Sequence, residues 1–567
     1  MTTSGSTAVS PPVLPRDVVD ALFAADLPEV DHWEQLYPPR RLPEGAHVTR
    51  FAPSPTGYVH IGGVYVAMIC QDVSRTSGGV YITRVEDTDT AREVEGALAQ
   101  FGRAFDYFGL HPDETDPAVE PGREGRYGPY RQSRREAVYH SYVRQLLRDG
   151  RAYLDFATRE ELAEITARQQ AAKVAPGYYG RWAVWRDAPV ERVLGELERG
   201  TAHVVRFRAP DLPPGARTTY TDVIRGRLEH EANRNDVVIL KASDTWPRLP
   251  TYHFAHAVDD HLMRVDLVVR AEEWISSVPL HLQLFETLGF APPAYAHIAP
   301  LMKQIPGGKR KLSKRKDAEA GVDFYVEQGY PAAAVLYYLR GLANGRLAEM
   351  PLPEALAAPI HLEECGVAGP LVDLVKLEDI SADYIATLPS PVVVDAVRAW
   401  AEQYDPQVAR ALDGDPDLAV RAVSVERVGV ENPRKDLRKW SDFRAAYGFF
   451  FPQLFEPVTD ADDPRFAGLG VAPDVVRAVL HDLARRYRPV VEGDAWFAQI
   501  RELAARHSFA PTAKEFKNDP DAYPGSIREA SQLVRITLTG STRSPNLHDV
   551  AMTLGPGEVL RRLSGVR

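Results

Sequence analysis

The apolar positions near residue 50 fall into short runs separated by glycines and prolines. The run at 48–51 predicts a strand, and the run at 64–69 predicts a helix that opens at 62–63. The glycines at 78–79 end that helix, and residues 80–85 predict a second strand. A strand, a helix and a strand at this spacing are typical of a parallel βαβ unit.

A second α/β portion follows much later in the chain. Its apolar runs lie at 236–240, 251–258 and 267–270, and the last run precedes a predicted helix at 277–288. The intervening residues 131–235 differ in character, because they combine charged segments with an amphipathic helix near Glu136–Leu147. We therefore expect one nucleotide-binding fold that is split by an insertion.

The C-terminal third of the chain shows helical periodicity. Val475, Val479 and Leu483 recur at helical spacing, with Asp474 as the expected cap, and Trp496, Ile500 and Leu503 recur in the same way. At the other end, residues 1–10 are small and polar and predict disorder. Residues 13–45 predict a short helix followed by a proline-rich connector. There is no internal repeat.

Composition narrows the class of protein. A chain of 567 residues, 44% hydrophobic and 26% charged, predicts a soluble protein of several domains. The net charge of −11 argues against a generally basic nucleic-acid coat, although a basic groove remains compatible with it. Two cysteines, Cys70 and Cys365, are too few for a structural zinc site or a disulfide framework. With neither a membrane-length apolar run nor a secretory signal, we expect a cytoplasmic protein.

Two motifs suggest phosphate chemistry. His60, Gly62 and Gly63 stand at the start of the first predicted helix, where free N–H groups and glycines admit a phosphate or an adenine ring. The alternative is a tight turn with a capping histidine. Much later, residues 309–316 hold six cations in eight positions after Gly307-Gly308, which suits stabilisation of a departing pyrophosphate. A solvated patch, an RNA-backbone contact or a nuclear localisation signal would also explain that run.

Charged residues also follow two of the predicted strands, where ligands bind in such sheets. Glu86 and its acidic neighbours could hold an amino group or order Mg²⁺, or else Asp87 or Asp89 could cap a helix beginning near Arg92. Arg270 could clamp a carboxylate in bidentate fashion, or it could form an ordinary ion pair.

Six stretches together resemble the glutamyl-tRNA synthetases, from about Val48 to the end of the chain. The first is RFAPSPTGYVHIGG at 50–63. The others follow in the family's order: RVEDTD at 84–89, GPYRQS at 128–133, PTYHFAHAVDDHLM at 250–263, VVRAEEW at 268–274 and KLSKRKD at 311–317.

The resemblance implies a class I fold of α/β type: a split Rossmann-type domain with an α+β insertion, followed by an all-α C-terminal domain. The implied domains are a 1–45 N-terminal extension, the catalytic halves 46–130 and 236–300, an acceptor-end insertion 131–235, a stem-contact domain 301–388 with the KLSKR loop, and a helical anticodon-binding domain 389–567. It also implies ATP with Mg²⁺, L-glutamate and tRNA(Glu) as reactants, and a monomer.

The implied reaction has two steps and needs no protein nucleophile. Glutamate attacks the α-phosphate of ATP to give glutamyl-adenylate, and a ribose hydroxyl at the end of the tRNA then attacks the acyl carbonyl. Catalysis would consist of positioning and electrostatic stabilisation. In this family the first step is expected to need bound tRNA.

Site residues carry over position by position. The glutamate-binding positions are Arg50, Ser54, Glu86, Tyr252 and Arg270, with an arginine facing the side-chain carboxylate and Glu86 facing the α-amino group. The ATP-binding positions are His60, Gly62, Gly63, Glu273, Trp274, Lys311, Ser313 and Lys314. Of these, His60 and Lys314 would act on the phosphates directly.

The chain departs from the family in three places. Gly63 stands where many class I enzymes have histidine, a position that varies among glutamyl members. The stretches at 153–156 and 178–181 match a region that binds zinc in some relatives, but they hold no cysteine, so neither zinc nor another protein-bound metal is expected. Residues 1–45 precede the first strand and are expected to pack on the catalytic domain. Part of them, residues 33–45, resembles the lead-in of a longer bacterial subgroup.

Several alternatives remain open. A glutaminyl-tRNA synthetase would carry β-barrel anticodon domains, a shortened glutamyl-queuosine-type modifier would lack them, and a non-catalytic tRNA-binding paralogue would not need His60 or Lys314. The sequence does not show whether tRNA(Gln) is also charged. Nor does it identify the residues that read the anticodon, although four cations are candidates: Arg434, Lys435, Arg438 and Lys439.

Overall fold

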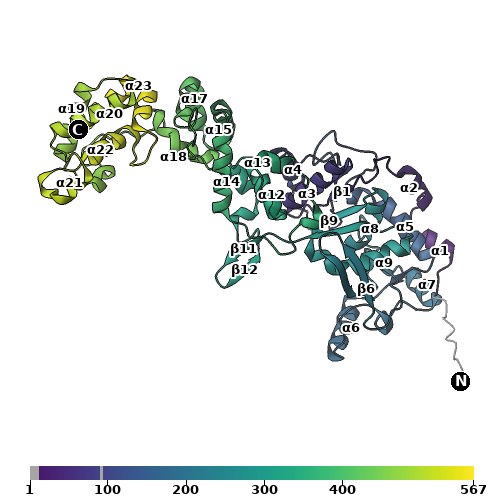
Figure 1. Cartoon of the computed structure of the whole chain (residues 1–567). Helices are drawn as coiled ribbons and strands as arrows, with labels where there is room; N and C mark the ends of the chain where they lie inside the picture. Colours follow the sequence, from purple (N-terminus) through teal and green to yellow (C-terminus); the bar gives the residue numbers. More distant parts are fainter. Residues whose placement is uncertain (1–11, 90–92) are drawn as a thin grey trace. The chain divides into compact units, whose positions relative to one another are not determined.

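A computed structural model describes residues 12–89 and 93–567 (Figure 1). The chain forms two compact units. The first comprises residues 1–324 and 336–372, and the second comprises residues 325–335 and 373–567. Within the described residues, no helix combines the length and apolarity needed to cross a bilayer.

The first unit is built on a seven-stranded sheet with the order β3-β2-β1-β9-β10-β6-β7. Neighbouring strands run parallel except for the last pair, β6 and β7, which is antiparallel. The bounds of the strands are β1 Val48–Phe51, β2 Val80–Thr83, β3 Glu114–Thr115, β6 Arg217–Asp222, β7 Gly226–Glu231, β9 Leu267–Ala271 and β10 Ala294–Ile298. The first predicted strand is confirmed, and the second ends two residues earlier than predicted.

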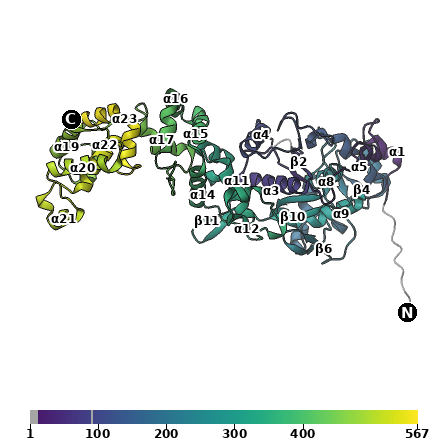
Figure 2. The ribbon, with the colours of Figure 1, turned by 45° about the horizontal axis from the view of Figure 1, so that its top comes forward.

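Helices connect these strands and pack on the sheet (Figure 2). Helix α3, Ile61–Ser77, joins β1 to β2 and packs on β1, β2 and β9. It ends at Gly78, whose φ of 75° places it in the left-handed region that favours glycine. The predicted βαβ unit is therefore confirmed. The remaining helices of this layer are α4 Ala97–Phe108, α8 Tyr252–Leu262 and α9 Val278–Leu288, and a 3₁₀ segment, Glu272–Ser277, precedes α9.

Residues 136–240 include a second, three-stranded sheet with the order β4-β5-β8. Its strands are β4 Ala152–Asp155, β5 Val204–Phe207 and β8 Val238–Leu240, and the helices of this region are α5 Glu136–Arg148, α6 Arg159–Ala171 and α7 Val190–Glu198. The predicted amphipathic helix is confirmed as α5.

Strand membership differs from the expectation at both ends of the insertion. Strand β8, expected in the second half of the nucleotide fold, pairs with β5 instead. Strands β6 and β7, expected in the insertion, extend the main sheet beyond β10. Strand pairing is a long-range choice that the periodicity of one segment does not encode. The domain limits themselves stay predictions.

The segment before β1 packs on helices and strands of the first unit. It contains two helices rather than the one expected, α1 Arg16–Ala21 and α2 Val30–Leu36. Arg40 binds Glu114 with two hydrogen bonds of 2.8 and 2.7 Å. Glu34 accepts hydrogen bonds from the Tyr142 hydroxyl at 2.8 Å and from Arg264 at 2.9 Å, and it lies 2.8 Å from His261 Nε2. These contacts join the segment to α5, α8 and β3.

The basic run begins in the second strand of a small antiparallel hairpin, β11 Met302–Ile305 and β12 Gly308–Lys311, and continues into the loop after it. Further along, the chain forms α10 Val322–Gln328, α11 Ala332–Ala343, α12 Gly345–Ala348 and α13 Leu352–Ala357. Arg340, buried on the part of α11 that belongs to the first unit, donates to Asp72 on α3 at 2.7 Å and so fastens residues 336–372 to the sheet layer of that unit.

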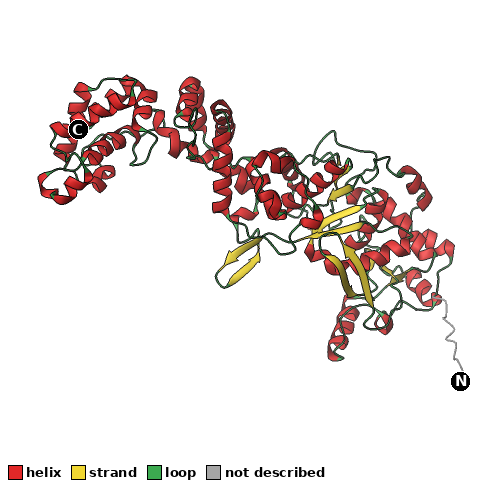
Figure 3. Cartoon of the chain, viewed as in Figure 1, coloured by secondary structure: helices red, strands yellow, loops and turns green. Residues whose placement is uncertain are grey.

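The second unit consists of helices joined by loops (Figure 3). Its main helices are α14 Leu374–Thr387, α15 Ser390–Tyr404, α16 Pro406–Gly414, α17 Pro416–Ser424, α18 Phe443–Tyr447, α19 Pro473–Arg486, α20 Gly493–Arg506, α21 Ala513–Asn518, α22 Ile527–Thr539 and α23 Leu547–Ser564. The helical prediction for this region is confirmed. One detail is wrong: Asp474 lies inside α19, and Ala472 holds the cap position without a side-chain bond.

Candidate functional site

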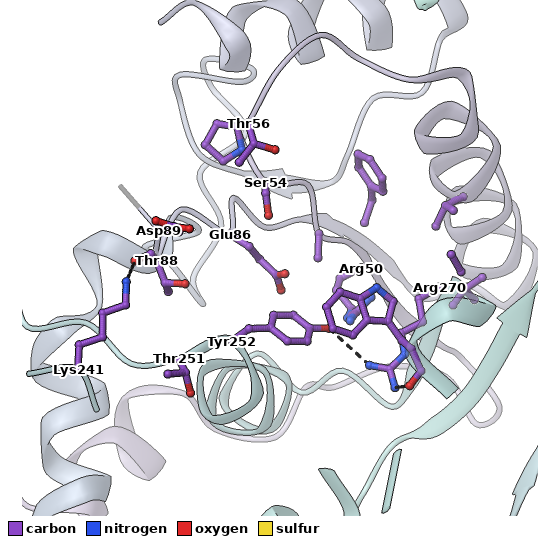
Figure 4. Close-up of a pocket in the computed structure, with 17 residues that line it drawn as sticks. Arg50, Ser54, Thr56, Glu86, Thr88, Asp89, Lys241, Thr251, Tyr252 and Arg270 are labelled. Carbon is purple, nitrogen blue, oxygen red and sulfur yellow. Dashed lines mark hydrogen bonds between the residues drawn. The ribbon is translucent and has the colours of Figure 1, made fainter. Parts of the chain in front are cut away.

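A cavity of about 690 Å³ opens at the carboxyl ends of β1, β2 and β9 (Figure 4). All five predicted glutamate-binding positions line it: Arg50, Ser54, Glu86, Tyr252 and Arg270. We call this space the first cavity. The parallel strands explain the gathering, because residues far apart in sequence reach the same edge of the sheet.

The floor of the first cavity holds a buried ionic network. Asp260 on α8 accepts from Arg50 Nε at 3.3 and 3.4 Å and also from Arg84, and all three side chains are buried. Arg84 donates in addition to Glu86 at 2.9 Å. Burial raises the pKa of the Glu86 carboxyl against the opposing effect of Arg84. These bonds hold the side chains of Arg50 and Glu86 in place.

Tyr252 and Arg270 form one side of the first cavity. Figure 4 shows the Glu86 carboxylate pointing toward Tyr252, with Arg270 beyond the tyrosine hydroxyl at 3.5 Å from it. The Trp274 ring lies 4.4 Å from the Tyr252 ring. The cavity thus presents cationic groups, the carboxylates of Glu86 and Asp89, and an aromatic wall.

Arg270 does not form the ordinary ion pair that was the alternative interpretation. Among the described residues, no carboxylate lies within 4.0 Å of its guanidinium. Its nitrogens donate instead to His297 Nε2 at 3.0 Å and to the Trp274 carbonyl at 3.4 Å, and one lies 3.3 Å from His281 Nδ1. No sequence motif pointed to His281 or His297, since each is an isolated histidine.

The acidic neighbours of Glu86 have structural partners. Asp87 is buried and accepts from the backbone and hydroxyl of Ser133 at 2.8 and 2.6 Å and from Arg131 at 2.5 Å. The helix near Arg92 that Asp87 or Asp89 was predicted to cap falls outside the described residues, so this alternative stays a prediction. Asp89 lines the first cavity, and Arg92 lies outside the described residues.

A second cavity of about 380 Å³ adjoins the first, and Val66 and Ala271 line both. Of the predicted ATP-binding residues it collects His60, Gly62, Gly63, Glu273, Lys311 and Lys314. Trp274 lines the first cavity instead, and Ser313 lines neither of the two.

His60 caps helix α3, as the structural alternative supposed. Its Nδ1 accepts from the Gly62 N–H at 2.8 Å, and the Leu312 carbonyl lies within hydrogen-bonding reach of the ring. Burial, together with the nearby Lys314, lowers the pKa of the imidazole to about 4, so the ring is neutral near pH 7. A neutral ring that accepts at Nδ1 carries its proton on Nε2. His60 therefore caps the helix and lines the cavity at once.

The two glycines allow close approach at the start of α3. A Cβ on Gly62 would lie 2.9 Å from His60 Nδ1, and a Cβ on Gly63 would lie 3.3 Å from the Phe51 ring. A side chain at either position would press against the capping histidine or against the strand core. Gly63 therefore fits a place where any larger residue would require the Phe51 ring to shift.

The basic loop reaches back to the first signature. Lys314 donates to the Tyr58 carbonyl, and Lys311 pairs with Glu273. Burial lowers the pKa of the Lys314 ammonium. Asp317, to which the sequence assigned no role, accepts from Arg310 at 2.6 and 2.8 Å and from the Ser313 N–H at 2.9 Å. It organises the loop on which Lys314 stands.

No group of three or more His, Cys, Asp or Glu side chains suited to a metal ion occurs within the described ranges 12–89 and 93–567. Where some relatives bind zinc, hydrogen bonds tie the chain together. The Tyr178 hydroxyl donates to Asp155 at 2.9 Å, and the Tyr153 hydroxyl donates to Asp236 at 2.8 Å.

In the second unit, the four candidate RNA-facing cations all pair with carboxylates of the same unit. Arg434 binds Asp436, Lys435 binds Asp383, and both Arg438 and Lys439 approach Glu378. Most of these groups are partly exposed, so the pairs are weak and open to exchange. Their contact with RNA stays a prediction.

Comparisons with known proteins agree with one another. The family model described as tRNA synthetases class I (E and Q), catalytic domain, matches residues 47–350. A glutamate–tRNA ligase of Clostridium beijerinckii is 39% identical over 95% of this chain and 97% of its own, and one of Sorangium cellulosum is 38% identical over 96% and 98%. A crystal structure of a glutamate tRNA ligase from Elizabethkingia meningosepticum, in complex with its amino acid, superposes with a TM-score of 0.73 at 26% identity. That superposition covers 92% of this chain and 98% of the other.

Proposed function

The chain belongs to the glutamate–tRNA ligases, class I aminoacyl-tRNA synthetases, and from that premise we propose how its two cavities divide the reaction. It attaches L-glutamate to tRNA at the expense of ATP. The observation that carries the division of labour is the wall of Val66 and Ala271, which lines both cavities. Glutamate in the first cavity and ATP in the second would bring carboxylate and α-phosphate together there.

The first cavity matches the charges of glutamate, which carries two carboxylates and one ammonium group. Arg270, which has no carboxylate partner among the described residues, receives the side-chain carboxylate. Glu86 faces the α-amino group, while Arg50 and Ser54 complete the contacts. An arginine without a counter-ion gains most from an anionic ligand, so this end of the cavity selects an acid.

The second cavity receives ATP at the start of α3. The helix N-terminus and the close approach at Gly62 and Gly63 suit phosphate or adenine, and His60 faces them as a neutral donor. Lys314 stabilises the charge that develops on pyrophosphate. Glu273 in the second cavity and Trp274 in the first would lie near the ribose and adenine, and Lys311 and Ser313 would support the loop.

In the first step, an α-carboxylate oxygen of glutamate attacks the α-phosphorus of ATP, and the bond to pyrophosphate breaks. In the second step, a terminal ribose hydroxyl of tRNA attacks the acyl carbon of glutamyl-adenylate, loses its proton, and releases AMP. The protein contributes orientation and charge stabilisation rather than a covalent intermediate.

Mg²⁺ would accompany ATP rather than occupy a protein cage. Glu273 is the one carboxylate among the described residues that line the second cavity, and it already pairs with Lys311. Mg²⁺ commonly binds through substrate phosphates with one or two carboxylates. The donor set therefore fits an ion held mainly by the triphosphate, with Glu273 as its protein neighbour.

ATP–pyrophosphate exchange tests the proposal. We expect exchange that depends on glutamate and on tRNA, because members of this family are expected to need tRNA for the first step. Glutamine in place of glutamate should give little exchange. The absence of exchange with glutamate under every tRNA condition would refute the assignment of substrates.

The role of Lys314 has a matched control on the same loop. Lys314→Ala should lower adenylate formation by about a hundredfold, as removal of a transition-state donor typically does, while tRNA binding changes little. Lys316→Ala removes an exposed cation of the same run that does not line the cavity. Equal losses of adenylate formation and tRNA binding in Lys314→Ala, or equal effects of the two substitutions, would contradict the role.

The tRNA side of the reaction is assigned by region. Residues 131–235 would hold the acceptor end, 301–388 the stem, and the helices of 389–567 the anticodon. The named relatives do not favour a glutaminyl enzyme. Charging tRNA(Glu) and tRNA(Gln) side by side would decide whether one or both are substrates, and a monomer remains our expectation.

A further inference from the structure

Three neighbouring strands bring a line of polar side chains to the edge of the first cavity. Arg270 on β9 stands directly opposite His297 on β10 in the parallel register. Asp222, the last residue of β6, pairs with Tyr295 on the same strand β10. His297 Nδ1 lies 2.6 Å from Asp222, and His297 Nε2 accepts from Arg270 Nε at 3.0 Å. All three side chains are buried.

The hydrogen bonds define the state of the His297 ring. Burial and the neighbouring Arg270 lower the pKa of its imidazole, although Asp222 opposes them, so the ring is neutral near pH 7. A carboxylate accepts only, so the His297 Nδ1 proton must point at Asp222. Nε2 is then a free lone pair, which is what a guanidinium donor needs. The opposite tautomer would place two N–H groups against each other.

Asp222 is itself fixed on every side. Its Oδ1 accepts from the backbone N–H groups of Ile224 and Arg225 at 3.0 and 2.9 Å. Its Oδ2 accepts from the His297 backbone N–H at 3.2 Å in addition to the ring. Four bonds therefore hold this carboxylate, and through His297 they hold the plane of the Arg270 guanidinium. The Tyr295 ring, 4.8 Å from the guanidinium carbon, supports one of its faces.

Every partner of Arg270 in the described part of the chain is uncharged. His297, the Tyr252 hydroxyl, the Trp274 carbonyl and His281 orient the guanidinium without neutralising it. The negative charge of Asp222 reaches it only through the intervening imidazole. An acid in direct contact would instead cancel the charge and remove the preference for an anionic ligand.

We propose that Asp222 and His297 are positioning residues that hold Arg270 oriented but unneutralised, so that the first cavity selects a side-chain carboxylate over a carboxamide. This inference rests on the proposed function, in which Arg270 receives the side chain of glutamate. We call the hydrogen-bonded series Asp222–His297–Arg270 the relay. It makes discrimination between glutamate and glutamine depend on β6, β9 and β10 together rather than on Arg270 alone.

Two substitutions at His297 separate positioning from packing. His297→Leu removes the acceptor for Arg270 Nε, whereas His297→Gln keeps a carbonyl acceptor and an N–H donor for Asp222. We expect His297→Leu to raise the KM for glutamate about ten- to a hundredfold, the range for a lost hydrogen bond to a charged group. The KM for ATP should stay within about twofold, because the second cavity does not include the relay. His297→Gln should recover most of the loss.

Asp222→Asn and a control complete the design. Asp222→Asn no longer fixes the His297 tautomer, so it should raise the KM for glutamate and lower the ratio of kcat/KM for glutamate over glutamine. His111→Leu removes a partly buried imidazole that lies 3.2 Å from Glu120, outside both cavities, and it should leave both KM values unchanged. Thermal unfolding of every variant reports whether the fold is intact.

The outcomes separate this inference from the function on which it rests. An unchanged KM for glutamate in folded His297→Leu, or equal rises in KM for glutamate and ATP, would overturn the relay alone. A failure of His297→Gln to recover activity would do the same. Wild-type protein without glutamate-dependent exchange would overturn the proposed function and the inference together.

Discussion

The buried network beneath the first cavity permits a quantitative test of stability. Asp260→Asn removes one negative charge from a cluster in which Arg50 and Arg84 face Asp260 and Glu86. At the 3.3 Å separation of Arg50 and Asp260, the Coulomb attraction is about 5 kcal/mol at an effective dielectric constant of about 20. Because the variant leaves a buried cation without its partner, we expect the free energy of unfolding to fall by about 3–5 kcal/mol.

The sign of the pH dependence follows from Asp260 itself. Burial alone would raise the pKa of this carboxyl, but Arg84 and Arg50 hold it well below its usual value. The wild-type advantage is therefore fully present above the unfolded pKa of about 4 and is lost only as pH falls below it.

Urea unfolding, followed by tryptophan fluorescence, measures the free energy of unfolding of the wild type and of Asp260→Asn at pH 7 and pH 5. Glu164→Gln is the control, because its pair with Arg168 is exposed and should contribute less than about 1 kcal/mol. A loss below about 1 kcal/mol in Asp260→Asn, or a loss equal to that of the control, would refute the reasoning. It would mean that water or rearrangement already screens the arginines.

Two further predictions concern the N-terminal segment and the basic loop. Partial burial would raise the pKa of Glu34, but hydrogen bonds from His261 and other neighbours lower it to about 2. Glu34→Gln should therefore lower the free energy of unfolding by about 1 kcal/mol above pH 4.5, after allowance for solvent screening. The loss should become progressively smaller toward pH 2. A pH-independent loss in chemical unfolding would contradict this. Asp317→Asn should release Arg310 and the Ser313 N–H, and slow adenylate formation about tenfold with little change in the KM for glutamate. An unaltered exchange rate would show that Asp317 does not organise the loop.

Local pattern was sufficient for the elements that carry the site. The strand 48–51 and the helix that begins beside His60 follow from the spacing of apolar residues and from glycine breaks, and the same spacing predicts the helix around Trp496 in the second unit. The predicted site residues came from resemblance, and the structure places six of them, Trp274 included, in the first cavity and six in the second. Their chemical roles stay predictions.

What the sequence missed depends on pairing between distant segments. Strand β8 looked like a continuation of the nucleotide fold, but its partner β5 lies in the insertion. Asp222 and His297 are 75 residues apart and belong to no motif, so only the register of β6, β9 and β10 brings them to Arg270. Asp260 belongs to the motif at 250–263, but spacing along the chain does not show that Arg50 and Arg84 are its partners.

The wall shared by the two cavities has a consequence for ligand design. Val66 and Ala271 border both cavities. One molecule that joins an amino-acid head to an adenosine head could therefore occupy the two cavities at the same time. Binding of the first head would hold the second at a high effective concentration, so the linked compound should bind far more tightly than either half. The linker length that gives the tightest binding would then measure the distance between the two bound heads.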